Sequence, residues 1–186
     1  MAYVKKHARD TGKKVLTLLA DAGGSIVESF LDPYGRLRLS NMFVAHGKVD
    51  RTRMRRVLKS LEKQELVTIK EKKGEITVTL TKNGSEKALK YQVEDMQIPK
   101  PDWWDRKWRL VMFDIPEARK SSRNAFKAVL DNLGFIQLQH SVYVHPYECH
   151  NEIEFVRNVY EIKPFVKLLV VEKLEGEGTL RTDFDL

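Results

Sequence analysis

The stretch from Asp50 to Gly84 joins a basic amphipathic segment to a short hairpin, and this combination constrains the fold more than any other feature of the chain. Apolar residues recur at helical spacing in its first half, at Met54, Val57, Leu58 and Leu61. Asp50 is a candidate N-cap for this helix. We therefore expect one face that packs against a core and one cationic face, the arrangement by which a recognition helix enters the major groove of DNA.

Cationic and polar side chains occupy the exposed positions of this predicted helix and the turn that follows. They are the candidate DNA-binding residues, namely Arg51, Thr52, Arg53, Arg55, Arg56, Lys59, Lys72 and Lys73. A basic flank on an amphipathic helix can also be no more than a solvated face. The segments around the helix decide between these two interpretations.

Two short runs after the helix have the composition of β-strands. Residues 67–70 and 76–80 are rich in β-branched side chains, and Lys72-Lys73-Gly74 supplies a turn between them. A basic hairpin directly after a basic helix is typical of a wing that contacts the DNA backbone.

The residues before Asp50 complete this pattern. Val15, Leu16, Leu18 and Leu19 predict a first helix that ends near Gly23-Gly24, and residues 37–46 have room for a second, shorter helix. The order of helix, helix, basic helix and hairpin predicts a winged helix-turn-helix.

Positive charge is concentrated in the first half of the chain. Residues 1–100 contain 21 Lys/Arg and 12 Asp/Glu, a net charge of +9, whereas residues 101–186 contain 12 and 14, a net charge of −2; together they give the +7 of the chain. This asymmetry predicts a polyanion-binding module joined to a unit with another role.

Membrane binding is the competing use of positive charge. No apolar run approaches the roughly 20 residues of a spanning helix, and the first residues do not resemble a signal peptide. The single cysteine, Cys149, excludes an intramolecular disulfide and fits a reducing compartment. We therefore expect a cytoplasmic protein with no membrane partner.

A segment with two prolines, Ile98–Asp102, separates the halves of the chain. Thr81 is a candidate N-cap for a long final helix of the first half. Continuing that helix through the prolines would be energetically unfavourable, so we expect it to end before them. The predicted domains are a winged helix DNA-binding domain at 1–97, a linker at 98–107, a second domain at 108–174, and a tail or extra edge strand at 175–186.

The second half alternates strands and helices. Apolar runs predict strands at residues 108–115, 135–138, 141–144 and 165–171, and apolar stripes at helical spacing lie within 125–133 and 153–160. The resulting order, βαββαβ, is that of a ferredoxin-like domain. The predicted fold class is therefore α+β, an N-terminal winged helix-turn-helix followed by a ferredoxin-like βαββαβ domain.

The second half also carries a family signature. The run Trp104–Glu117, followed by Leu133-Gly134-Phe135, Ser141–Val144 and Pro146-Tyr147, closely resembles the central domain of the PaaX family of bacterial repressors. The resemblance implies a winged helix fused to a ferredoxin-like domain related to the second Cas protein, a small CRISPR-associated adaptation endonuclease. It also implies a small-molecule effector as a partner.

Asp114 is the residue on which an alternative function depends. In the nuclease relatives, an aspartate at the end of the first strand lies near its twin across a dimer axis, and the pair binds a divalent metal. The resemblance brings Asp114 to that position, with Arg119 and Ser141 nearby. Two carboxylates suit Mg²⁺, but Asp114 could instead cap the turn before the next helix. His145, Cys149 and His150 are too few for a closed zinc site.

We conclude from the sequence that the chain is a homodimeric transcriptional regulator that binds specific double-stranded DNA, a repressor of the PaaX type. The winged helix would bind DNA and the ferredoxin-like domain would form the dimer. No cofactor is expected for this function. The alternative is a Mg²⁺-dependent phosphodiesterase, either a nuclease or a component of CRISPR spacer acquisition with an appended winged helix, in which Asp114 would be the catalytic and metal-binding residue.

Overall fold

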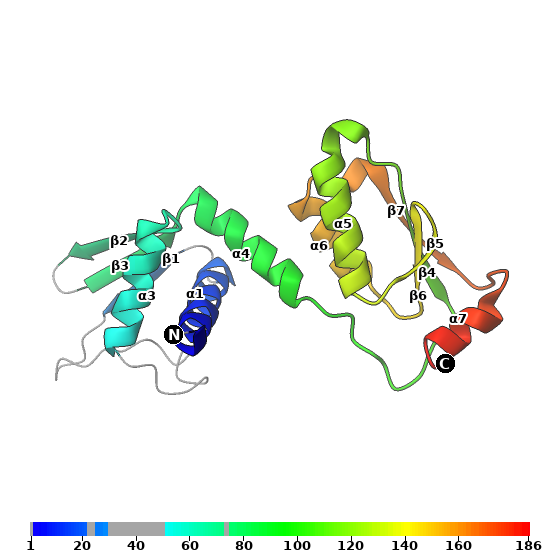
Figure 1. The fold of residues 1–186 in the computed structure, drawn as a ribbon, viewed down its shortest axis with the longest axis horizontal. Coiled ribbons are helices and arrows are strands. Elements are labelled where there is room, and N and C mark those ends of the chain that lie inside the picture. Colours follow the sequence, from blue (N-terminus) through cyan, green and yellow to red (C-terminus); the bar gives the residue numbers. More distant parts are fainter. Residues whose placement is uncertain (1, 22–24, 30–50, 73–74) are drawn as a thin grey trace. The chain divides into compact units, whose positions relative to one another are not determined.

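The computed structural model describes residues 2–21, 25–29, 51–72 and 75–186 (Figure 1). The chain divides into two compact units, Met1–Gln92 and Val93–Leu186. The predicted helix at residues 37–46 lies outside the described residues. None of the described helices combines the length and the apolar character that crossing a membrane requires.

The first unit contains helices around a small antiparallel sheet. Its elements are α1 (Ala2–Asp21), β1 (Ser25–Ser29), α3 (Arg51–Lys63), β2 (Val67–Lys72), β3 (Glu75–Leu80) and most of α4 (Lys82–Asp95). The sheet order is β1-β3-β2, and both pairs are antiparallel. The basic helix and the hairpin that the sequence predicts are confirmed, whereas β1 was not expected.

The core of the first unit forms where α3 packs against α1 and the sheet. The four apolar residues of the predicted stripe on α3 are all buried, with Met54 and Leu61 at 1% and 5% exposure. They share one cluster with residues of α1, β2, β3 and α4, including Leu16, Leu19, Val67, Val78 and Ala88. The opposite side of α3 is therefore turned to solvent.

Helix α4 begins with a side-chain cap. The backbone N–H of Gly84 donates to Oγ1 of Thr81 (3.0 Å), so the predicted N-cap is confirmed. The N–H of Thr81 donates to the carbonyl oxygen of Leu66 (3.1 Å). A Cβ atom at Gly84 would lie 1.8 Å from that same oxygen, which explains why glycine occupies this position.

The second unit is a four-stranded antiparallel sheet with two helices on one face. Its elements are β4 (Trp108–Phe113), α5 (Lys120–Asn132), β5 (Ile136–Gln139), β6 (Val142–His145), α6 (His150–Val159), β7 (Val166–Val171) and α7 (Glu177–Asp183), with the short 3₁₀ helices η1 (Glu117–Arg119) and η2 (Lys163–Phe165). The sheet order is β5-β6-β4-β7. This order and the βαββαβ succession make the unit ferredoxin-like and confirm the predicted arrangement.

The two faces of this sheet have different surroundings. Val111 and Phe113 of β4 point toward α5 and α6 and pack against Phe126 and Ile153 in the main core. Successive side chains of a strand point to opposite faces. Trp108, Leu110 and Met112 therefore lie on the other face, which neither α5 nor α6 covers.

Helix α7 covers one end of that other face. The sequence predicts a tail or an extra edge strand at residues 175–186, but residues 177–183 form a helix. Helical spacing places Leu180 and Phe184 side by side, and both pack in a cluster around Trp108. The indole N–H of Trp108 donates to Glu177 (3.1 Å), and Arg181 pairs with Glu177 one turn later. These contacts favour the helix over a strand.

Candidate nucleic-acid interface

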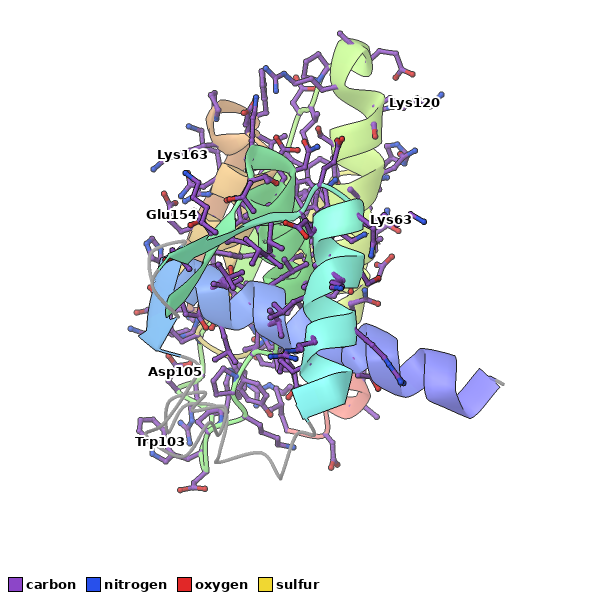
Figure 2. The ribbon with its side chains drawn as sticks, turned by 90° about the vertical axis from the view of Figure 1, so that its left-hand side faces the viewer. Lys63, Trp103, Asp105, Lys120, Glu154 and Lys163 are labelled. Atoms are coloured by element: carbon purple, nitrogen blue, oxygen red, sulfur yellow. The ribbon has the colours of Figure 1, made fainter. Side chains whose placement is uncertain are left out.

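The outer side of α3 presents four cations to solvent, Arg55, Arg56, Lys59 and Lys63. Within the described part of the chain, neither hydrogen bonds nor ion pairs engage their side chains. Figure 2 shows Lys63 near the end of this helix. Four unpaired cations on one helix create a local positive potential that attracts polyanions.

Many cations of the second unit are paired instead. Lys120 lies 3.3 Å from Glu117, and Lys163 forms an ion pair with Glu154; Figure 2 labels Lys120, Glu154 and Lys163. Hydrogen bonds from Lys163 and Arg157 lower the pKa of Glu154 to about 2. The contrast between paired and unpaired cations is a feature that the net charge of each half could not reveal.

The other predicted DNA contacts lie at the start of α3 and at the end of β2. Arg51, Thr52 and Arg53 form the first turn of α3, and Lys72 ends β2, but the side chains of these four residues lie outside the described part of the chain. Lys73 lies outside it entirely. Arg55, Arg56 and Lys59 are therefore the predicted contacts whose side chains the structure describes.

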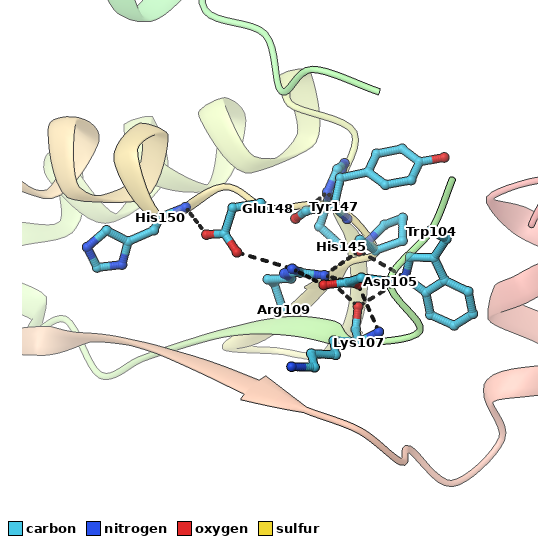
Figure 3. A network of polar contacts seen from close by, with 9 residues as sticks. Trp104, Asp105, Lys107, Arg109, His145, Tyr147, Glu148 and His150 are labelled. Carbon is cyan, nitrogen blue, oxygen red and sulfur yellow. Dashed lines mark hydrogen bonds and ion pairs between the residues drawn. The ribbon is translucent and has the colours of Figure 1, made fainter. Parts of the chain in front are cut away.

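A buried arginine organises a polar network at the start of β4 (Figure 3). Arg109 is 4% exposed and donates to both carboxylate oxygens of Asp105, at 2.7 and 2.6 Å. It also donates to the carbonyl oxygens of Lys107 and Pro146 (both 2.8 Å) and to Glu148 (3.1 Å). The hydrogen bond with Asp105 raises the pKa of Arg109 and lowers the pKa of Asp105. Such pairing is what a buried charge requires.

Aromatic rings pack around this polar network. Trp104 donates its indole N–H to the carbonyl oxygen of Pro146 (3.0 Å), and the ring of His145 packs against Phe135 and Phe184. Burial lowers the pKa of His145 to about 4, so its ring is neutral near pH 7. The network ties the segment before β4 to the end of β6 and to α7. Sequence analysis did not identify it, although Asp105 and Arg109 are four residues apart.

No metal centre is found among the described residues, since no group of three or more His, Cys, Asp or Glu side chains lies close enough to hold an ion. Near His145, Cys149 and His150, the three residues considered for zinc, the backbone N–H of His150 donates to the carboxylate of Glu148. Burial raises the pKa of the Cys149 thiol to about 12, so this cysteine is an unreactive core residue.

Asp114 lies in the loop after β4, with an exposed side chain. Its N–H donates to the carbonyl oxygen of Phe165 (2.9 Å), and the N–H of the preceding Phe113 donates to the carbonyl oxygen of Ser141 (3.0 Å). Arg119, the other residue that the resemblance brings near Asp114, donates to the carbonyl oxygen of Glu161 (3.2 Å) and lies over the ring of Phe165. Among the described residues, no side-chain cap supports the helices η1 and α5, so the turn-capping role for Asp114 is not observed.

Comparison with known families found a match in the second unit. Residues 101–182 match the model of the PaaX protein central Cas2-like domain. The second unit is therefore similar to the central domain of PaaX proteins. It spans the ferredoxin-like sheet, both of its covering helices and nearly all of α7. No curated protein matches the chain.

Proposed function

We propose that this protein is a homodimeric transcriptional regulator of the PaaX type, a repressor that binds specific double-stranded DNA through its first unit. The observation that carries the proposal is the row of exposed cations on α3, which have no ion-pair partner among the described residues and whose helix is buried on its opposite face. A helix held by its apolar face and cationic on its free face suits the major groove.

The arrangement of the first unit supports a winged helix-turn-helix. Helix α3 is followed directly by the hairpin β2–β3, and β1 pairs with β3 on the side opposite to β2. Lys72 at the end of β2, with Lys73 next to it, would then contact phosphate groups from the tip of the wing. Phosphate contacts add affinity that depends on salt but not on base sequence.

The uncovered sheet face of the second unit supports a dimer. Beyond α7, it exposes Met112 (42%), Leu138 (37%) and Leu169 (40%) on three different strands. A second copy placed over this face by a two-fold axis would bury these side chains. The dimer would present two α3 helices to two half-sites of a near-palindromic operator.

A salt-dependent DNA titration tests the proposal. Fluorescence anisotropy with labelled double-stranded DNA should show binding whose log affinity falls linearly with log salt concentration. Changing Lys59 and Lys63 to Ala should make the slope of log affinity against log salt shallower, by the amount expected for the loss of about two phosphate contacts. The matched control is Lys120→Ala with Lys163→Ala, which removes two exposed but paired lysines and should leave the slope unchanged. Equal effects of both pairs would contradict the assignment of α3.

Sedimentation of the full chain tests the dimer. Met112→Asp combined with Leu169→Asp should shift the protein toward monomer, because two carboxylates would have to be buried in the interface. Val170→Asp is the control: Val170 is 55% exposed, and strand alternation directs it to the opposite face from Leu169. Dissociation by the control alone would contradict the proposed face.

A further inference from the structure

We propose that, among the side chains of α3 that the structure describes, Arg56 and Lys59 read base edges, with Arg56 directed to guanine, and that the neighbouring Arg55 contributes only charge. This inference deepens the proposed function and rests on it. It distinguishes between side chains that composition alone treats as equivalent.

The buried stripe of α3 gives the direction of each described side chain on the exposed side of the helix. Met54, Val57, Leu58 and Leu61 are 1–7% exposed, so their mean direction points into the core. At about 100° per residue, Arg56 and Lys59 each lie about 30° from the direction opposite to the core, whereas Arg55 lies about 70° from it. Arg56 and Lys59 therefore straddle the centre of the exposed face.

The two flanks of this face are less suited to base contacts. On the flank beside Arg56, the amide of Gln64 donates to the carbonyl oxygen (2.9 Å) and the hydroxyl (3.2 Å) of Ser60, so these side chains are already engaged. On the other flank, Arg55 is accompanied by the exposed carboxylate of Glu62. A carboxylate is repelled by phosphates, which keeps this flank farther from the DNA strands.

Spacing along the helix separates the central cations into two roles. Arg56 and Lys59 are about 4.5 Å apart along the axis, close to the 3.4 Å step between successive base pairs. Lys63 lies about 10 Å beyond Arg56, nearly the width of the major groove. Arg56 and Lys59 would thus reach adjacent base pairs, and Lys63 would reach the backbone at the edge of the groove.

The chemistry of the side chains then selects the base. The guanidinium group of Arg56 can donate two parallel hydrogen bonds to O6 and N7 of guanine, the commonest specific contact in the major groove. A lysine at the same position keeps the charge but loses the planar fork. Arg56→Lys therefore separates base reading from electrostatic attraction.

The experiment measures the affinity and the base preference of the full chain. DNA fragments retained from a randomised double-stranded pool would be sequenced for the wild type, Arg56→Lys, Arg56→Ala and Arg55→Ala, and each protein would be titrated at several salt concentrations. Circular dichroism checks that each variant is folded, which we expect because both positions are exposed. Arg56→Lys should lose about ten-fold preference for guanine at one position in each half-site, with the salt slope unchanged.

The two arginines should differ in one further respect. Arg56→Ala should lose the same preference together with about one charge of salt slope, whereas Arg55→Ala should weaken binding to all sequences about equally. Unchanged base preference in both Arg56 variants, or a relaxed preference in Arg55→Ala, would overturn this inference but leave the proposed function standing. Failure of the wild type to bind DNA would overturn both.

Discussion

Replacement of Gly84 by alanine tests how helix α4 joins the hairpin of the first unit. The added Cβ would lie 1.8 Å from the carbonyl oxygen of Leu66 and 3.1 Å from Cδ2 of Leu80. The close neighbour is backbone, so a side-chain rotation cannot relieve the contact. Overpacking of this kind costs about 1–3 kcal/mol, and displacing the hydrogen bond from Thr81 to Leu66 adds about 1 kcal/mol. We expect Gly84→Ala to lower the free energy of unfolding of this unit by about 2–4 kcal/mol.

Gly12→Ala is the matched control in the same unit. Its Cβ would lie 3.6 Å from Cδ2 of Leu61, an ordinary contact, and Gly12 lies inside helix α1. Alanine there should stabilise the unit by about 0.5–1 kcal/mol, because glycine loses more backbone entropy in a helix. The two substitutions are chemically identical and should have opposite effects.

Urea denaturation followed by two signals provides the measurement. Far-ultraviolet circular dichroism reports the helices of both units, whereas tryptophan fluorescence reports the second unit, because Trp103, Trp104 and Trp108 all lie there. Gly84→Ala should move a dichroism transition to lower urea, and Gly12→Ala should move it to higher urea. A Gly84→Ala protein that unfolds at the wild-type urea concentration would refute the close approach of α4 to Leu66.

Three further predictions concern the second unit. Burial holds the pKa of His145 near 4, below its ordinary value of 6.5. As the pH falls, this imidazole is therefore protonated in the unfolded chain before it is protonated in the folded chain. The free energy of unfolding should therefore fall by up to about 3 kcal/mol between pH 6.5 and 4, and His145→Phe should remove this contribution to the urea midpoint. Asp105→Ala leaves buried Arg109 without its main partner and should cost about 3 kcal/mol in urea unfolding, whereas Glu148→Ala, whose side chain is 64% exposed, should cost less than about 1 kcal/mol. Asp114→Asn should leave DNA affinity unchanged; cleavage of DNA or RNA that needs Mg²⁺ and disappears in this variant would instead establish the nuclease function.

Hydrophobic periodicity predicted most of the described fold. The stripes on α3, α5 and α6 and the apolar runs of β4 and β7 depend on local spacing, which a single sequence contains. The cap of Thr81 on α4 was also predictable, because a capping side chain lies within three residues of the group that it binds. Strand β1 was missed because its partner, β3, lies about fifty residues later in the chain.

The features that depend on long-range contacts were not predictable. Gly176 and Gly178 flank the first residue of helix 177–183, which disfavours a helix there, and this helix is stabilised by Trp108, which lies about seventy residues earlier. The burial of Arg109 was not predictable for the same reason. An arginine in a strand is normally expected in solvent, and its burial depends on groups from the 146–148 segment as well as on Asp105. The candidate DNA contacts Arg55, Arg56 and Lys59 were identified because the apolar stripe of α3 defines its exposed side.

Sequencing of the double-stranded DNA fragments that the full-length protein retains from a genomic or randomised pool tests the central claim most directly. At moderate salt, a dimeric regulator with one α3 helix in each protomer should enrich one inverted repeat, whose half-sites are separated by about one helical turn or a multiple of it. Fragments retained by the Arg56→Ala variant should keep this inverted repeat but lose the guanine preference at one position in each half-site. Retention without any shared sequence, or no retention at salt concentrations where nonspecific binding persists for other basic proteins, would contradict the account.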